Sequence, residues 1–429
     1  MTVTVTKSKT IGLKDFEQDT NIDMLQTVLD LNDLTYYGKK VLMRVDFNVS
    51  IDNDGIIGED YRIRMTIPTM DYLTKRGAKL ILMSHLGRPA SGHDIHYSLA
   101  PVANRLSEMM AVNKVRFVGD CVGPAVQKEI DQMSMGEILL LENLRFHKEE
   151  ELNDSDFAKK LASLADVYVN DAFSTSHRKH SSIYSTPKLF DIKLAGLNLK
   201  KELEYLSMIR ETPVKPFTLV IGGVKITDKI GALEKLLPKA DNLLVGGATA
   251  YTFLKAKGVK TGNSPIDHEH LSWVTNALSK YSDKIALPTD HVVSTSSLGS
   301  PSNGSSVTAN LMKGDIPDGM VGFDIGIETS QFYSSQISAK NAGTIFWVGP
   351  MGLFEVGLFS NGTINVAKSM ALAFWRGSNT LIGGGDTLEA IKRARVSEAE
   401  VSHVSTGGGA TLKFLAGNEM PGIEVLNRI

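Results

Sequence analysis

The chain lacks several features that would assign it to a particular class of protein. Its 429 residues include one cysteine, Cys121, so no disulfide can form within the chain, as is usual in a reducing compartment. The net charge of −2 provides no general attraction to nucleic acid or to an anionic membrane. No apolar run approaches the length of a membrane span, and the N-terminus has no apolar secretory core. We therefore expect a cytoplasmic globular protein that binds neither nucleic acid nor membrane.

The common nucleotide and zinc motifs are also missing. There is no G-x-x-x-x-G-K-[ST] segment, which excludes a P-loop enzyme. No G-x-G-x-x-G follows a predicted strand, which disfavours a dinucleotide-binding dehydrogenase. The protein-kinase triplets H-R-D and D-F-G and the zinc pattern H-E-x-x-H do not occur. A nucleotide site in this chain must therefore follow another design.

Glycine is abundant, and in the second half of the chain it directly follows apolar segments. Four such runs are Gly222-Gly223, Gly246-Gly247, Gly383–Gly385 and Gly407–Gly409. Glycine lets a backbone approach a phosphate, and the N-terminus of the following helix offers free N–H groups and a positive dipole. Four runs in one half of the chain predict a nucleotide or polyphosphate site.

Strand and helix patterns alternate along both halves, which predicts an α/β fold. Each half is expected to be a Rossmann-like lobe, with a parallel sheet covered by helices on both faces. The predicted strands of the first half span residues 40–45, 79–83, 115–118, 137–141 and 167–169, and the predicted helices span 67–76, 99–110, 123–132 and 156–165. The second half has predicted strands near 217–221, 242–245, 284–287, 321–324, 344–347, 380–382 and 401–406.

The same patterns predict the division into domains. We expect a leader with one short helix over residues 1–30, an N-terminal lobe over 31–197, an interdomain hinge helix within 198–212 and a C-terminal lobe over 213–414. The Gly/Ser-rich segment Ser294–Ser306 is expected to be a surface loop.

Basic and polar side chains follow the predicted strands of the first half. Ligands of open parallel sheets bind at the carboxyl ends of the strands, so these positions are candidates for a site. They are Asp46, Asn48, His85, Arg88, Arg145 and Arg178, with Arg62 ahead of a predicted helix. A single arginine of this kind is usually a solvated surface charge, but the whole set predicts a binding site for a small, multiply anionic substrate.

The second half offers groups suited to a nucleotide. Lys225 and Lys229 are four residues apart, a spacing that on a helix directs both ammonium groups to one ligand. Asp386 follows three glycines and is either an N-cap or a ligand of Mg²⁺. Glu355 is a candidate for holding ribose hydroxyls. Together the two halves favour phosphoryl transfer between a nucleotide and a small anion, a reaction that depends on positioning and charge neutralisation.

Ordered motifs along almost the whole chain, from about Leu29 onward, resemble the phosphoglycerate kinase family. They are Arg44–Val49 (RVDFNV), Met83–Pro89 (MSHLGRP), Leu139–His147 (LLLENLRFH), Tyr168–Phe173 (YVNDAF), Ser176–Arg178 (SHR), Lys201–Leu206 (KELEYL), Asp228–Leu237 (DKIGALEKLL), Ala250–Gly258 (AYTFLKAKG), Ile382–Thr387 (IGGGDT) and Val401–Ala410 (VSHVSTGGGA). The order and number of these motifs disfavour an unrelated sugar or acid kinase on a similar two-lobed plan.

The resemblance implies a reversible, hinge-bending and Mg²⁺-dependent enzyme of glycolysis. It would transfer a phosphoryl group between 1,3-bisphosphoglycerate and ADP, forming 3-phosphoglycerate and ATP, and it would act as a monomer. The substrate-binding residues it implies are Asp46, Asn48, Arg62, His85, Arg88, Arg145 and Arg178. The nucleotide-binding residues it implies are Gly223, Lys225, Lys229, Gly246, Gly247, Pro350, Glu355, Gly383, Gly384, Gly385, Asp386 and Thr387. Arg62, Lys225, Gly384 and Gly408 would assist the transfer itself, Asp386 would hold the metal, and residues 415–429 would pack back onto the N-terminal lobe.

Several positions depart from the family pattern. They are Ser50, Ser174, Val224, Thr249, Ile327 and Val348. Val348 replaces an asparagine whose amide would lie near the nucleotide, which predicts weakened or altered nucleotide affinity. The alternative is a non-catalytic relative that serves as a binding protein, because a shared fold does not guarantee a shared activity. The retained pair Arg62 and Lys225 favours the enzyme.

Overall fold

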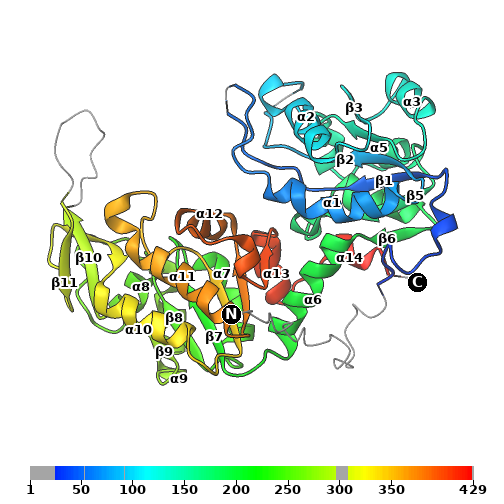
Figure 1. Ribbon diagram of the computed structural model, residues 1–429. Helices are drawn as coiled ribbons and strands as arrows, with labels where there is room; N and C mark the ends of the chain where they lie inside the picture. Colours follow the sequence, from blue (N-terminus) through cyan, green and yellow to red (C-terminus); the bar gives the residue numbers. More distant parts are fainter. Residues whose placement is uncertain (1–24, 53, 91, 296–307, 428–429) are drawn as a thin grey trace, which may run out of the picture.

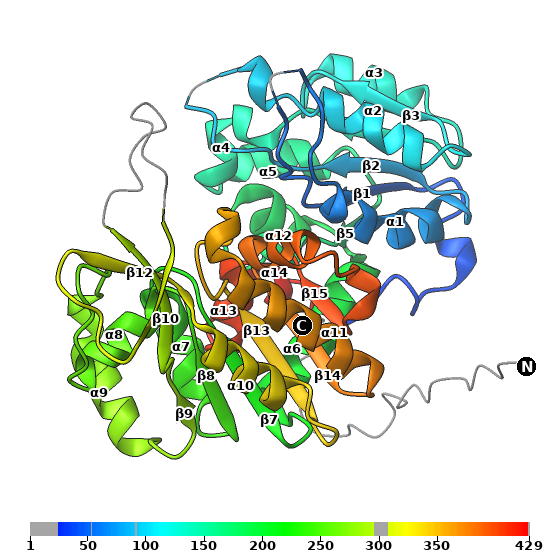
Figure 2. The same ribbon diagram turned by 60° about the vertical axis from the view of Figure 1, so that its left-hand side comes forward.

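Two parallel sheets of six strands form the cores of two lobes, and helix α6 (Leu197–Glu211) lies between them (Figure 1). The computed structural model describes residues 25–52, 54–90, 92–295 and 308–427. The expected short helix of the leader and most of the expected loop Ser294–Ser306 lie outside these residues. Figure 2 shows the two lobes from another side, with α6, α13 and α14 near their junction.

The N-terminal sheet has the strand order β3-β4-β2-β1-β5-β6, and its neighbouring strands pair in parallel. Its strands are β1 (Lys40–Arg44), β2 (Lys79–Met83), β3 (Val115–Val118), β4 (Ile138–Leu141), β5 (Val167–Asn170) and β6 (Lys193–Ala195). Its helices are α1 (Tyr61–Thr74), α2 (Ala100–Met109), α3 (Pro124–Asp131), α4 (Lys148–Glu151) and α5 (Ser155–Ala162).

The C-terminal lobe contains a second parallel sheet in the order β15-β14-β13-β7-β8-β9, together with an antiparallel sheet in the order β11-β10-β12. Its strands are β7 (Phe217–Ile221), β8 (Asn242–Val245), β9 (Ile285–Ala286), β10 (Asp290–Thr295), β11 (Asn310–Lys313), β12 (Met320–Ile325), β13 (Thr344–Val348), β14 (Asn379–Gly383) and β15 (His403–Ser405). Its helices are α7 (Thr227–Leu236), α8 (Thr249–Ala256), α9 (Leu271–Lys280), α10 (Ile327–Ile337), α11 (Asn361–Trp375), α12 (Gly385–Arg393) and α13 (Gly409–Leu415); α14 (Pro421–Glu424) follows.

The strands are apolar on both faces because helices cover both faces of each sheet. In β1, Leu42 packs into one core while Val41 and Met43 pack into another, as the alternation of side chains along a strand requires. One of these cores continues through Leu203 of α6 to Leu219 of β7. The hinge helix is therefore packed against both sheets, and the predicted fold class is confirmed.

The antiparallel sheet was not predicted. We assigned residues 321–324 to the parallel series, but they belong to β12, which pairs antiparallel with β10. Strand β10 also pairs antiparallel with β11. The short apolar run of β12 has the same local pattern as a parallel strand, and only its pairing partner decides its direction.

Two other boundaries differ from those predicted. The helix expected at 67–76 begins at Tyr61, and Pro68 lies within it. Its first turn contains Arg62 and Arg64, so the apolar pattern used to predict the helix does not extend to its start. Near the N-terminus, Val28 N donates to Ala195 O at 3.0 Å, and Leu25 and Val28 are buried. The N-terminal lobe thus includes residues that we had placed in the leader.

The end of the chain returns to the N-terminal lobe. Gly422 N donates to Ser176 O at 2.9 Å, and Asn170 Nδ2 donates to Gly422 O at 2.8 Å. These two bonds fix α14 beside the end of β5. Among the described residues, no helix combines the length and apolar character needed to cross a bilayer.

A buried carboxylate connects the end of β5 with two helices. Asp171 is fully buried; Oδ1 accepts from Leu199 N at 2.9 Å and Oδ2 from Thr69 Oγ1 at 2.7 Å. Burial raises the pKa of Asp171 from 3.8 to about 7, although these hydrogen bonds oppose the rise. The folded protein therefore holds this proton more tightly than the unfolded chain. The stabilising contribution is complete below pH 3.8 and is lost as the pH rises through about 7.

We expect Asp171→Asn to reduce this loss of stability with rising pH. The stability of the variant relative to wild type should therefore be higher at pH 8 than at pH 5. The difference in the free energy of unfolding, variant minus wild type, should increase by on the order of 1 kcal/mol or more between the two pH values. Urea unfolding at both pH values measures the difference. Asp131→Asn is the control, because the Asp131 side chain is 59% exposed. An equal shift at the two pH values would contradict the role given to Asp171.

Candidate active site

The predicted polar residues of the N-terminal lobe meet at the carboxyl edge of its sheet. Arg62, near the start of α1, forms an ion pair with Asp46, which follows β1. Nδ1 of His85, which follows β2, lies 4.0 Å from an Asp46 carboxylate oxygen. Three elements that are distant in sequence therefore converge on one carboxylate.

The neighbouring loops are tied together by hydrogen bonds. Gly87 N donates to Asn48 Oδ1 at 2.8 Å, and Arg145 Nη1 donates to Gly87 O at 2.6 Å. Arg145 lies in the one-turn helix η4 (Leu144–Phe146), and its Nε lies 3.0 Å from Glu151 Oε1. Arg88 is exposed, whereas Arg178 is partly buried. The loops after β1, β2 and β4 thus form a continuous rim.

Titration shifts indicate a strongly positive environment. Burial lowers the pKa of Arg145, and the charges of Arg178, Arg44 and Arg88 lower it further despite the opposing charge of Glu151. Burial and the neighbouring arginine charges also lower the pKa of His180 to about 3. Arg145 is thus surrounded by other cations, an arrangement suited to a ligand with several negative charges.

Asp46 and His85 have defined charge states near neutral pH. Burial alone would raise the pKa of Asp46, but the charge of Arg62 and a hydrogen bond from Ser174 hold it at about 2. Burial lowers the pKa of His85 well below its usual value, and Arg44 adds to this effect. Asp46 is therefore ionised and His85 neutral, so that His85 can take part in hydrogen bonds without adding charge.

Two contributors to this region were missing from the predicted set of site residues. Arg44 is almost fully buried in β1; its Nη2 lies 3.2 Å from His85 Nδ1 and its Nε donates to Ser182 Oγ at 3.0 Å. The sequence did offer a signal for Arg44, because an arginine directly after the apolar residues of a buried strand is unusual. Ser174, noted only as a departure from the family pattern, donates to Asp46 through its hydroxyl group.

Not all glycines of the C-terminal lobe leave room for a ligand. A Cβ on Gly247 would lie 2.5 Å from Gly223 N, so the loops after β7 and β8 require glycine to pack against each other. Gly246 is closely packed against Met351. By contrast, a Cβ on Gly385, Gly408 or Gly409 would meet nothing within 4 Å. Some glycines of the four runs therefore serve packing between loops, while others leave open space at a helix N-terminus.

The open glycines lie at helix N-termini that have no side-chain cap. The N-caps of α12 and α13 are Gly384 and Gly408, and no side chain accepts a cap hydrogen bond at either. Helix α7 also begins without a side-chain cap. Free N–H groups and positive dipole ends therefore lie on the edge where β14 and β15 end.

The two lysines and Asp386 differ in their surroundings. Lys225 precedes α7 and is exposed, so the argument from helical spacing is wrong. Lys229 is buried within α7; its Nζ donates to Lys225 O at 2.8 Å and lies 3.6 Å from where a Cβ on Gly223 would stand. Asp386 is exposed in the first turn of α12 and is not the N-cap, so the N-cap interpretation is wrong and the role as an Mg²⁺ ligand stays a prediction. Burial lowers the pKa of Lys229, while Asp228 and Asp386 oppose this shift.

The remaining predicted residues of this lobe lie on the loops after β13 and β14. Pro350 O accepts from Gly223 N at 2.7 Å, and Thr387 Oγ1 accepts from Gly349 N at 2.8 Å. Gly383 is the last residue of β14. Glu355 is exposed, and its carbonyl oxygen accepts from Arg393 Nη1 at 3.1 Å. These bonds join the loops after β7, β13 and β14 into one unit, which we call the glycine platform.

The two half-sites are carried by different lobes, and other residues connect the lobes. In the hinge, fully buried Glu202 of α6 accepts from Thr406 N at 2.7 Å and lies 2.9 Å from His403 Nε2. At the periphery, Arg64 Nη2 lies 3.2 Å from Glu398 Oε1. Helix α6 is thus hydrogen-bonded to the segment between β15 and α13, which contains Gly408.

One lobe presents converging cations, and the other presents uncapped helix N-termini with a buried lysine and an exposed carboxylate. This arrangement is that of a two-lobed phosphotransferase.

Comparison with known proteins defines the family. Residues 31–418 match the family model described as phosphoglycerate kinase. The phosphoglycerate kinase of Chlorobium limicola is 44% identical over 400 residues, covering 92% of this chain and 98% of the relative, and that of Chlorobaculum tepidum is 45% identical over 401 residues, with the same coverage. The solved structure of phosphoglycerate kinase from Coxiella burnetii aligns with a TM-score of 0.78 at 35% identity, covering 94% of this chain and 98% of that one. The chain belongs to the phosphoglycerate kinase family, which confirms the resemblance seen in the sequence.

Proposed function

We propose that this enzyme transfers a phosphoryl group reversibly between 1,3-bisphosphoglycerate and ADP, forming 3-phosphoglycerate and ATP. It acts in glycolysis and gluconeogenesis as a cytoplasmic monomer. The observation that carries the proposal is the pairing of a cationic site around Asp46 with the uncapped N-terminus of α12 beside Lys229. Each half has the charge that one of the two substrates requires.

The N-terminal lobe holds the glycerate substrate. Cationic side chains bind its phosphate and carboxylate, while Asp46 and the neutral His85 are placed to bond its polar groups. The residues assigned to this role are Asp46, Asn48, Arg62, His85, Arg88, Arg145 and Arg178. The lowering of the Arg145 pKa by burial and by the charges of Arg178, Arg44 and Arg88 supports the role, because a bound anion would relieve this repulsion.

The C-terminal lobe holds the nucleotide. Its phosphates lie at the glycine loops and helix N-termini, and Glu355 holds the ribose hydroxyls. The residues assigned to this role are Gly223, Lys225, Lys229, Gly246, Gly247, Pro350, Glu355, Gly383, Gly384, Gly385, Asp386 and Thr387. The exposed carboxylate of Asp386, a hard oxygen donor beside the open end of α12, fits Mg²⁺ and would hold it. When bound, Mg²⁺ neutralises charge on the phosphates.

The transfer needs no catalytic base. The attacking oxygen belongs to a phosphate or a carboxylate, both of which are ionised near neutral pH. Arg62 from one lobe and Lys225 from the other neutralise the charge of the transferring group, and the N-terminal dipoles at Gly384 and Gly408 assist. Because these groups are on separate lobes, closure about α6 must bring them together and exclude water.

A coupled assay tests the proposal. The folded protein is supplied with 3-phosphoglycerate and MgATP, and the product is reduced with NADH by glyceraldehyde-3-phosphate dehydrogenase. We expect NADH oxidation that requires both substrates. If millimolar substrates support no turnover, the proposed activity fails and the chain is a binding protein of the same fold.

Val348 is expected to weaken nucleotide binding. It is the last residue of β13, is 9% exposed and is paired in register with Gly383. We expect Val348→Asn to lower the KM for the nucleotide by about 10- to 100-fold, since a hydrogen bond to a charged group contributes about 1.5–3 kcal/mol. Val348→Thr, of similar volume, controls for packing. An unchanged nucleotide KM and kcat in Val348→Asn would rule out the effect.

A further inference from the structure

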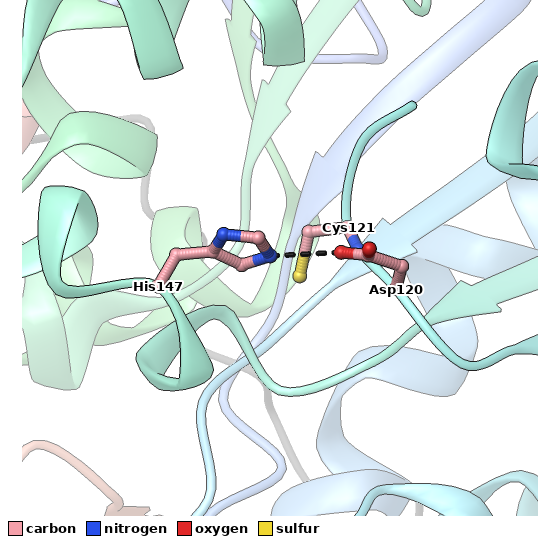
Figure 3. A group of neighbouring side chains, drawn as sticks. All are labelled: Asp120, Cys121 and His147. Carbon is pink, nitrogen blue, oxygen red and sulfur yellow. Dashed lines mark hydrogen bonds and ion pairs between the residues drawn. The ribbon is translucent and has the colours of Figure 1, made fainter. Parts of the chain in front are cut away.

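Three potential metal-binding side chains meet in the N-terminal lobe, outside the residues assigned to either substrate. Asp120 and Cys121 are adjacent in the loop after β3, and His147 follows η4 (Figure 3). Their ligand atoms all lie within 4.8 Å of one another. The side chains of all three converge on one point in Figure 3, with the Cys121 sulfur beside the hydrogen bond that joins His147 to Asp120.

The distances are close to those of a tetrahedral zinc site. Zinc bonds of about 2.0–2.3 Å to nitrogen, oxygen and sulfur place neighbouring ligand atoms about 3.4–3.6 Å apart. His147 Nε2 lies 2.8 Å from Asp120 Oδ1 and must move slightly away to admit a cation. The remaining separations, at most 4.8 Å, must contract by about 1 Å.

Neighbouring groups already orient the ligands. The His147 ring stacks on Phe157, with ring centroids 4.9 Å apart and planes inclined by 28°. Asp120 Oδ1 accepts from Cys121 N at 2.6 Å, and Cys121 Sγ donates to Glu142 O at 2.9 Å. Such supporting contacts around metal ligands reduce the entropic cost of assembling a site.

Access and charge also suit a cation. Cys121 is fully buried, whereas the side chains of Asp120 and His147 are 43% and 24% exposed and leave an approach from solvent. The carboxylate of Asp120, itself one of the ligands, also favours a dication at this position.

We propose that Asp120, Cys121 and His147 form a binding site for a soft divalent cation such as Zn²⁺. Oδ of Asp120, Sγ of Cys121 and Nε2 of His147 provide three ligands, and water completes the coordination. The Cys121 thiol releases its proton to solvent and loses its hydrogen bond to Glu142 O, and His147 carries its proton on Nδ1. The carboxylate and the thiolate together balance the charge of the cation.

The cation would join two segments that are not otherwise linked covalently. One is the loop after β3, and the other leads from η4, where Arg145 lies two residues before His147. A soft cation is distinct from Mg²⁺, which prefers oxygen ligands and has no affinity for a thiol group. The site therefore stabilises the N-terminal lobe independently of the nucleotide.

Cobalt(II) is the probe that tests the proposal on the full-length protein. Coordination of cobalt by a thiolate produces a charge-transfer absorption in the near ultraviolet, and Cys121 is the only cysteine in the chain. We expect this band to saturate at one equivalent of Co²⁺ and to disappear when Zn²⁺ is added. Binding should also raise the melting temperature, since a ligand that binds only the folded state stabilises it.

Matched variants separate the site from general histidine binding. Cys121→Ser should abolish the band, and His147→Gln should weaken Co²⁺ binding at least tenfold. His270→Gln should change neither the thiolate band nor the Co²⁺ affinity. His270 forms a similar pair with Asp267, with Nδ1 and Oδ1 2.8 Å apart, but has no cysteine beside it to act as a third ligand. The proposal is overturned if folded wild type shows no thiolate band at millimolar Co²⁺, or if the band is unaffected in His147→Gln. His147 is partly exposed, so this second variant remains informative if Cys121→Ser does not fold.

Discussion

Replacing Arg62 with methionine is expected to lower kcat by about three orders of magnitude, with a much smaller change in the KM of either substrate. Removing a preorganised charge that stabilises a transition state costs about 10²–10³ in rate, and arginines at transferring phosphoryl groups contribute at the upper end or above. Methionine keeps most of the side-chain volume, so the loss reports charge. The coupled assay at saturating substrates measures it.

The structure provides a matched control for Arg62. Arg76 follows the same helix, is paired with Asp33 and has a side chain 27% exposed, compared with 26% for Arg62. Arg76→Met should leave kcat within about threefold of wild type. Arg62→Met also leaves the buried Asp46 without its main cation, so its pKa should rise and the melting temperature should fall. If folded Arg62→Met retains wild-type kcat, Arg62 has no role in the transfer.

Lys225→Ala is expected to lower kcat by about 10²–10³ while the dissociation constant for ADP changes by less than about fivefold. Lys225 is exposed between β7 and α7, so its side chain can reach a transferring group after the lobes close. Loss of an interaction that binds the ground state and the transition state equally would raise mainly KM. Loss of an interaction made only in the transition state lowers kcat. Calorimetric titration with ADP and the coupled assay separate the two effects.

Lys235→Ala tests whether the loss is specific. Lys235 is exposed near the C-terminal end of α7, so it controls for removing an exposed lysine from this part of the lobe. A large increase in the ADP dissociation constant of Lys225→Ala, with kcat preserved, would make Lys225 a nucleotide-binding residue only. Loss of both activity and ADP binding would indicate damage to the glycine platform, where Lys229 Nζ bonds to Lys225 O.

The predictions from sequence were strongest where a local pattern carries the information. Apolar runs that are followed directly in sequence by polar residues or glycines predict the carboxyl edge of both sheets. The rule that parallel strands end on one edge predicts that Asp46 and His85 lie close together, and the structure places them so. The same reasoning failed for β12, because a short strand does not encode the direction of its partner.

Glycine shows the limit of local reasoning most clearly. The sequence does not distinguish Gly247, which is needed for contact with Gly223, from Gly385, which faces open space. Both follow a strand at the point where the chain enters a helix. The difference depends on which loop lies opposite, and that loop is elsewhere in the chain.

By itself, the sequence determined the α/β class, the two-lobed plan, the family and most candidate site residues, because periodicity and ordered motifs are local properties of the chain. Only the tertiary structure decided which charges neutralise each other, where α1 begins, and how the hinge contacts the C-terminal lobe. Glu202 and His403 are 201 positions apart, and Asp120 and His147 are 27 apart. Contacts of this kind depend on the packing of the whole chain, since each segment alone is compatible with many partners and only the complete core selects one.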